Sequence, residues 1–259
     1  MLLTPCLQYY EYTTSKSVSP LVTRASVNAL SLSSSSFPGW TITIDGLVAS
    51  PITLDVRALI AMFGIEKRFY RHRCVEAWSI ALPWVGFPLR KILSLVQPLA
   101  SATYVSFNSA SSSTFPLQSS SPGGLFGAAW PYLEGLSINE SWADIAFVAV
   151  GIFNDPLPPQ NGAPIRLVLP WKYGFKSAKS LTRITFTDQQ PRNWWQQISP
   201  REYGFWANVN PAFPHPRWSQ AQESQLIAST SGAVIPTQIF NSYGGEVSWM
   251  YGDDHSWFF

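Results

Sequence analysis

The chain has 259 residues, of which 46% are hydrophobic and only 12% are charged. This length allows one large domain with a sizeable core, and the charged fraction is about half of the roughly 25% that is usual in soluble domains. The net charge of +2 indicates no general attraction to nucleic acids, and the longest apolar runs, such as 145–153, are too short for the ~20 residues of a membrane-spanning helix.

Short strands dominate the predicted elements. Apolar and polar residues alternate with period two in most of them, which is typical of strands with one buried face. The predicted strands are 41–44, 69–74, 104–107, 147–153, 165–170 and 181–187. Two helices are predicted between them: one over 52–63, with Thr53 or Asp55 near its start, and one with Pro88 in its first turn.

The remaining segments suggest how the chain is divided. Residues 1–39 begin with an aromatic cluster and become Ser-rich, and 109–124 resemble a surface loop of serine and glycine. No repeat or linker interrupts the rest. We therefore expect an N-terminal strap and loop over 1–39, one main domain over 40–225 and a C-terminal extension over 226–259, with a mixed α+β fold.

Cys74 is the residue around which the candidate chemistry gathers. Arg71, His72 and Arg73 precede it directly, and Glu76 follows two residues later. A thiol in a positively charged setting is favoured as a thiolate, which is both a nucleophile and a metal ligand. Buried among aromatic residues, the same thiol would be an inert small hydrophobe. The residues alone leave both interpretations open.

Cysteine and histidine are too scarce to predict a zinc site. The chain has two cysteines, Cys6 and Cys74, three histidines, and neither a C-x-x-C nor an H-E-x-x-H motif. Two cysteines cannot build a disulfide framework, although a single bridge could form.

Two further segments suit a polar, anionic ligand. Residues 161–166 join an Asn-Gly turn to Arg166, a cation within an apolar strand that needs a partner when it is buried. Residues 172–179 combine basic, aromatic and small side chains in one short segment. Such residues suit a phosphate or a pterin ring. For Lys172 and Lys176, a solvated basic face is the favoured alternative.

Several long segments carry a family resemblance. The four longest are RHRCVEAW at 71–78, PWVGFPL at 83–89, LPPQNGAP at 157–164 and PWKYGFK at 170–176, and residues 202–205, 208–211 and 215–221 fit the same pattern. Together they resemble the catalytic subunits of bacterial protein-methionine-sulfoxide reductases, within the sulfite oxidase-like molybdopterin family. The resemblance runs from about residue 9 to about residue 223. It implies the sulfite oxidase-like molybdopterin-binding fold, with mixed sheets, short helices and long loops.

The resemblance implies one molybdenum–molybdopterin cofactor per chain. It makes Cys74 the thiolate ligand of molybdenum and places Glu76 near the metal, as the implied catalytic residues. The residues implied to hold the cofactor are Tyr10, Glu11, Ser109, Asn161, Arg166, Ser177, Ala178 and Lys179. Ser109 stands where the family usually has threonine, and Leu7 and Gln8 stand where it has two asparagines. A soft thiolate suits a metal held by a dithiolene, and arginine and lysine suit a phosphate.

The implied activity is the reduction of methionine sulfoxide in oxidised proteins or peptides, by oxygen-atom transfer to Cys-ligated molybdenum. The implied electron donor is a haem-containing membrane subunit. The aromatic residues expected to wall the pocket are Trp78, Trp84, Tyr203 and Trp206. The resemblance also implies a periplasmic protein. The sequence shows no export signal, so we expect that the protein stays where it is made or that the sequence lacks its true beginning.

Two alternatives stay open. The same fold could oxidise a small anion such as sulfite, with Arg71, Arg73 and Arg217 as the cationic groups at the mouth of the site. The chain could instead be an inactive, cofactor-free relative that acts as an interaction module, which Leu7 and Gln8 would favour.

Overall fold

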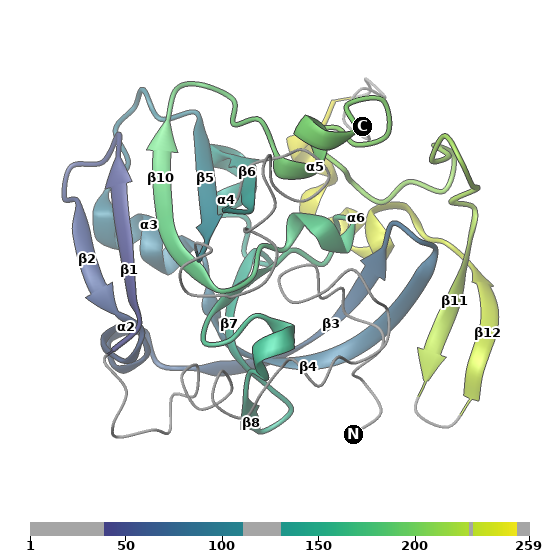
Figure 1. Ribbon diagram of the computed structural model, residues 1–259, viewed down its shortest axis with the longest axis horizontal. Coiled ribbons are helices and arrows are strands. Elements are labelled where there is room, and N and C mark those ends of the chain that lie inside the picture. The colour runs from purple at the N-terminus through teal and green to yellow at the C-terminus, as the bar shows by residue number, and fades with distance from the viewer. Residues whose placement is uncertain (1–38, 111–130, 228–229, 253–259) are drawn as a thin grey trace, which may run out of the picture.

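Two β-sheets with a few short helices make up the fold (Figure 1). The computed structural model describes residues 39–110, 131–227 and 230–252. Tyr10 and Glu11 of the expected strap, and most of the expected loop at 109–124, lie outside these residues. The mixed α+β prediction is confirmed.

The first sheet has five strands in the order β2-β1-β10-β5-β6. Their bounds are β1 Thr41–Gly46, β2 Ile52–Asp55, β5 Tyr104–Ser109, β6 Leu133–Ser137 and β10 Leu181–Thr187. β1 and β10 pair in parallel, and the other neighbours are antiparallel. This sheet brings Ser109, at the end of β5, beside Leu181, at the start of β10.

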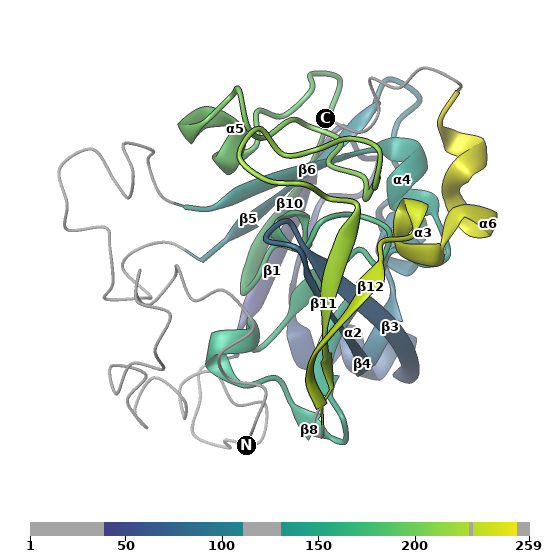
Figure 2. The same ribbon diagram turned by 90° about the vertical axis from the view of Figure 1, so that its right-hand side faces the viewer.

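The second sheet is organised around β4. Its central path is β12-β11-β4-β7-β8, with β3 also paired to β4 and β9 to β7. The bounds are β3 Glu66–Cys74, β4 Trp78–Pro88, β7 Phe147–Ile152, β8 Asp155–Pro156, β9 Arg166–Val168, β11 Gln222–Ile227 and β12 Thr230–Pro236. Figure 2 shows the β11–β12 hairpin in front of the long β3–β4 hairpin, whose tip β11 joins through Trp78 and Ser79.

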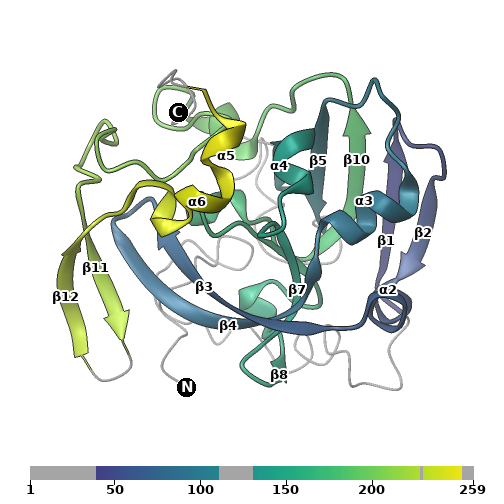
Figure 3. The same ribbon diagram turned by 180° about the vertical axis from the view of Figure 1, so that it is seen from behind.

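Short helices fill the connections. The α-helices are α2 Val56–Phe63, α3 Arg90–Val96, α4 Ile138–Trp142, α5 Trp194–Ile198 and α6 Gly244–Val247. The 3₁₀ turns are η1 Pro159–Asn161, η2 Gly174–Lys176, η3 Ile239–Ser242 and η4 Ser248–Met250. In the rear view of Figure 3, α3 runs across the five-stranded sheet, and its buried Ile92, Leu93 and Val96 join the main core.

Two sequence predictions are wrong in detail. Residues 52–55 form β2 rather than the start of a helix, because they pair with β1, and α2 begins only after Asp55. The Asp55 carboxylate accepts a hydrogen bond from the Arg57 amide at 2.7 Å, so it is the N-cap of α2. Pro88 ends β4 instead of opening a helix, and α3 begins at Arg90.

The longest strand, β4, was not predicted at all. It contains Pro83, Gly86 and Pro88, and most of its residues are buried, so period-two alternation is missing. β11 crosses the expected boundary at 225/226, and Tyr251 packs into the main core. The division of the chain into strap, main domain and extension stays a prediction.

Candidate functional site

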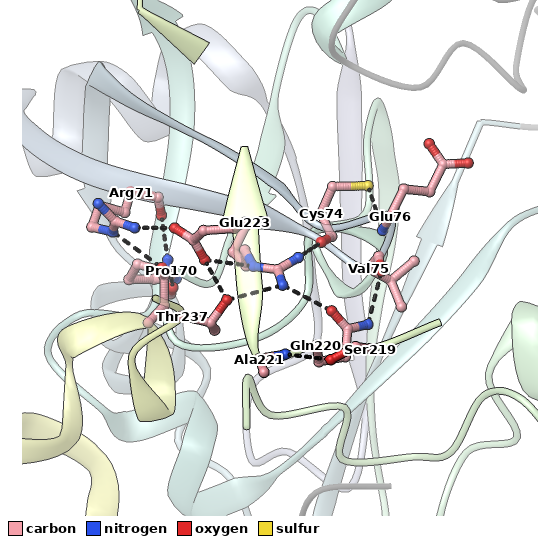
Figure 4. Close-up of polar contacts among 12 residues, drawn as sticks. Arg71, Cys74, Val75, Glu76, Pro170, Ser219, Gln220, Ala221, Glu223 and Thr237 are labelled. Atoms are coloured by element: carbon pink, nitrogen blue, oxygen red, sulfur yellow. Dashed lines mark hydrogen bonds and ion pairs between the residues drawn. The ribbon is translucent and has the colours of Figure 1, made fainter. Parts of the chain in front are cut away.

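Cys74 is the last residue of β3 and lies in the tight connection to β4. Cys74 and Trp78 are paired across the hairpin, and the Ala77 amide donates to the Cys74 carbonyl at 3.2 Å. Ala77 adopts a φ of 61°, which closes the turn. The thiol is buried, and its Sγ accepts the Glu76 amide at 3.5 Å (Figure 4). The turn therefore fixes where the sulfur lies.

A buried guanidinium supports this turn. Arg73 is fully buried, and its Nε donates to Glu223 Oε2 at 2.6 Å. It also donates to the Cys74 carbonyl and, at 2.8 Å, to Gln220 Oε1. The Gln220 amide in turn donates to the Val75 carbonyl at 2.8 Å. Figure 4 shows this network beside the turn, where it provides donors to the carbonyls of Cys74 and Val75.

A second group of polar residues gathers between β9, the 174–180 loop and the end of β5. Arg166 is buried, and it donates to the Asn161 carbonyl at 2.9 Å and to the Ser177 carbonyl at 3.2 Å. Its guanidinium lies 4.9 Å from the centre of the Trp84 ring. Lys179 Nζ donates to the Gln160 carbonyl at 3.1 Å. Two positive charges are thus held close to the 158–164 turn.

Gly162 allows the 158–164 turn to lie close to the side chains of Lys179 and Arg166. Its φ is +96°, and a Cβ there would lie 2.8 Å from the Lys179 side chain and 3.2 Å from the Arg166 Cβ. The Ser180 amide donates to the Gly162 carbonyl at 3.1 Å, and the Ala110 amide donates to the Ser180 carbonyl at 2.8 Å. These contacts tie the end of β5 to the turn.

The two buried polar atoms of this group are available to a ligand. Ser109 Oγ and Asn161 Oδ1 are each buried without a hydrogen-bond partner among the described residues. Buried polar atoms normally have partners, so each one needs an explanation. These two atoms lie near the cations Arg166 and Lys179 and near Gly162, where a side chain would crowd Lys179. Such a group of residues fits the polar edge and the phosphate of a pterin cofactor.

His72 connects Cys74 to these cations. It lies two residues before Cys74 on β3, so both side chains are on one face of the strand. Its Nε2 is close to Gly174, where a Cβ would lie 2.3 Å away. Burial, and then the charges of Arg166 and Lys179, lower the pKa of His72 to about 3. His72 therefore lies on the same face of β3 as the thiol and close enough to the two cations for their charges to lower its pKa.

The structure places Ser109, Asn161, Arg166 and the 177–179 loop in one group, and Cys74 and Glu76 in the turn between β3 and β4. Glu76 is half-buried. Ser177 Oγ accepts the Leu169 amide at 3.1 Å. Ala178 contributes backbone, since its carbonyl accepts the Leu167 amide at 2.8 Å.

Lys172 and Lys176 do not form the solvated face that we favoured. Both are fully buried. Lys176 Nζ lies 2.6 Å from Glu134 Oε2, and Lys172 forms an ion pair with Glu140. The sequence could not show this, because the two carboxylates come from β6 and α4, more than 30 residues away.

A small pocket, partly open to solvent, lies beside the Cys74 turn, and we call it the cavity. Val75 and Tyr173 line it and also belong to the buried cluster that contains Cys74. The described lining residues are Val75, Tyr173, Phe175, Glu202, Tyr203, Gly204, Ala207, Phe213, Pro214, His215 and Gln220. Of the four aromatic residues expected as walls, Tyr203 lines this cavity. Trp84 instead lies under Arg166.

Sequence reasoning missed three polar residues of this cavity, which are Glu202, His215 and Gln220. The only signal in the sequence was that 202–205 and 215–221 fit the family pattern. Nothing in that pattern assigned them a role.

The described residues show neither a membrane-spanning helix nor a cluster of metal-binding side chains. None of their helices is long and apolar enough to cross a bilayer. They also contain no group of three or more His, Cys, Asp and Glu side chains placed to bind a metal ion on their own.

Comparisons with known proteins agree with this geometry. The model of the oxidoreductase molybdopterin binding domain matches residues 30–195, which is more than half of the chain. The fold is similar to that of the sulfane dehydrogenase SoxCD from Paracoccus pantotrophus, with a TM-score of 0.50 and 17% identity. This match covers 74% of the present chain and 48% of the solved one, so the chain spans about half the length of that structure. The chain belongs to the oxidoreductase molybdopterin-binding domain family, has the sulfite oxidase-like fold, and its cofactor is molybdenum–molybdopterin.

Proposed function

We propose that this chain is a molybdenum-dependent reductase of methionine sulfoxide in oxidised proteins or peptides. Cys74 would be the thiolate ligand of molybdenum, with Glu76 beside it. Ser109, Asn161, Arg166 and the 177–179 loop would hold the pterin and its phosphate, together with Tyr10 and Glu11 of the strap. When bound, the cofactor supplies the oxygen-atom transfer and the electron storage.

The observation that carries this proposal is the character of the cavity beside Cys74. Its described lining is mostly apolar, and its one charged side chain is Glu202, an acid. Apolar walls favour the alkyl groups of a neutral S-oxide. A sulfite ion would instead need cationic groups to offset its loss of hydration.

The three arginines considered for an anion support the same choice. Arg71 and Arg73 both form ion pairs with the buried Glu223. Arg217 forms an ion pair with Glu202 at 3.0 Å and stacks on Trp218. None of the three lines the described cavity. These charges are therefore already matched within the protein.

The reaction converts the S-oxide, two electrons and two protons into the thioether and one water molecule. The sulfur–oxygen bond breaks and the sulfur is reduced. The electrons would come from a reduced haem protein of the membrane. The chain itself would bind and orient the substrate beside the Cys74 turn.

Substrate turnover tests the proposal. The holoprotein, given a reduced viologen dye, is assayed with a peptide that contains methionine sulfoxide, and separately with sulfite and an electron acceptor. We expect oxidation of the dye with the peptide and little turnover of sulfite, and Cys74→Ser should abolish the peptide reaction. Faster turnover of sulfite than of the peptide would reject the proposal.

A further inference from the structure

We propose that His215 binds the oxygen of the S-oxide through its Nε2–H, and that this residue makes the cavity prefer the S-oxide to the thioether. This inference rests on the proposed function and names the group that recognises its substrate. Nε2 of His215 is one of the buried polar atoms that have no hydrogen-bond partner among the described residues. His215 is only 6% exposed and lines the cavity beside Cys74.

The hydrogen bonds of the ring fix which nitrogen carries the proton. The Arg217 amide donates to His215 Nδ1 at 3.2 Å, so Nδ1 presents its lone pair. A neutral imidazole has one N–H, which must then be on Nε2. Burial lowers the pKa of His215, so the ring is neutral near pH 7. Nε2 is therefore a donor.

No described residue accepts a hydrogen bond from this donor. Glu202 Oε2 is 3.7 Å from Nε2, which is too far for a hydrogen bond. The same oxygen accepts the Arg217 guanidinium at 3.0 Å. A buried donor without a partner is costly, and an acceptor in the cavity would remove that cost.

His215 is held in a fixed position relative to the Cys74 turn. Its ring stacks on Trp218, with 3.8 Å between ring centres and 11° between ring planes. Trp218 Nε1 donates to the Val75 carbonyl at 2.7 Å. Val75 follows Cys74 directly, and both Val75 and His215 line the cavity. The donor and the thiol are thus joined by one short chain of contacts.

The chemistry of the cavity selects a neutral S-oxide. The S-oxide oxygen is a strong acceptor, and the apolar side chains of Val75, Ala207 and Phe213 can contact the two alkyl groups. The thioether lacks the oxygen, so its binding leaves Nε2–H without a partner. We expect roughly a tenfold or greater preference for the S-oxide, and the loss of this bond would favour release of the product.

Binding to the oxidised holoprotein, without an electron donor, tests the assignment. Calorimetric titrations with blocked methionine sulfoxide and blocked methionine give the ratio of their Kd values. We expect His215→Phe, which keeps a ring to stack on Trp218, to bring this ratio close to one. His215→Gln, which keeps an N–H near the Nε2 position, should retain most of the preference. An unchanged ratio in His215→Phe would overturn the proposal.

A second measurement observes the imidazole rings of the wild-type protein directly, and it uses a variant only to assign the resonance. The chain has three histidines, which keeps the nitrogen NMR spectrum of ¹⁵N-labelled imidazoles simple. We expect the S-oxide, but not the thioether, to shift one Nε2–H resonance, and this shift should be missing in His215→Gln. No shift with saturating S-oxide would overturn the proposal.

Turnover measured in parallel separates this inference from the proposed function. His215-dependent binding of the S-oxide without any turnover would support the binding site and reject the reaction. Turnover together with an unchanged Kd ratio in His215→Phe would reject the role of His215 and leave the reaction in place.

Discussion

Arg73 and Glu223 form a fully buried ion pair, with 2.6 Å between Arg73 Nε and Glu223 Oε2. Arg71 contacts the other oxygen of the same carboxylate, and Thr237 Oγ1 donates to Oε2 at 3.1 Å. Because Arg73 also donates to the Cys74 carbonyl, this pair links β11 to the turn that carries the thiol. Stability and the geometry of the site therefore depend on the same contacts.

Replacing Glu223 by glutamine should be strongly destabilising. Glu223→Gln keeps the side-chain volume but leaves Arg73 buried without its counter-charge, and breaking one side of such a pair costs about 3–5 kcal/mol. Urea unfolding measures the loss. The matched control is Arg183→Gln, which breaks the exposed Arg183–Asp45 pair and should cost about 1 kcal/mol or less. Equal losses in the two variants would contradict the role given to burial.

Replacing Cys74 by serine should remove one sulfur ligand from molybdenum while leaving the metal and the pterin bound through the dithiolene. A serine oxygen is a harder ligand than a thiolate, whereas Arg166 and Lys179 still contact the phosphate end. Elemental analysis and fluorescence of the released pterin give the content of each per chain. Cys6→Ser, at the other cysteine of the sequence, should keep both and every sulfur ligand. An unchanged number of sulfur ligands in the molybdenum X-ray absorption spectrum of Cys74→Ser would show that the thiolate is not a ligand.

Gly162→Ala should lower the cofactor content of the purified protein. The added Cβ would lie 2.8 Å from the Lys179 side chain, so Lys179 must move away from the cationic group. Gly232→Ala is the matched control, because Gly232 also has a positive φ, of +103°, but nothing lies within 4 Å of its Cβ position. Both variants carry the backbone strain of roughly 1–2 kcal/mol. If both kept the cofactor equally well, the close approach at Gly162 would not be needed for binding.

Stability should rise with pH above about 8 because of Lys172. Burial lowers the pKa of this lysine to about 8, although Glu140 opposes the shift. Between pH 8 and the ordinary lysine value of 10.5, the unfolded chain binds a proton that the folded chain does not. The free energy of unfolding then rises with pH, by up to roughly 1.4 kcal/mol per unit.

Urea unfolding at pH 7.5, 8.5 and 9.5 measures this rise. The matched comparison is Lys172→Met combined with Glu140→Gln, which removes both charges of the pair and should flatten the curve in this window. The same slope in the wild type and the double variant would show that Lys172 is not the source.

The amino-acid sequence by itself determined the fold class, six of the twelve described strands and the kind of cofactor. Alternating residues predicted the strand that ends at Cys74, and that strand is β3. The sequence motifs around Cys74, Asn161 and Arg166 predicted a molybdopterin-binding protein, and the family match confirms this prediction. These features are local, because each depends on residues close together in the chain.

Only the tertiary structure decided which distant residues meet. It paired Arg73 with Glu223 and buried Lys172 against Glu140, where the sequence favoured a solvated lysine. It also placed His215 near the Cys74 turn. His215 stacks on Trp218, and Trp218 donates a hydrogen bond to the Val75 carbonyl. Such contacts join segments about 30 to 150 residues apart, and their partners are chosen by burial and charge, which no local pattern of residues records.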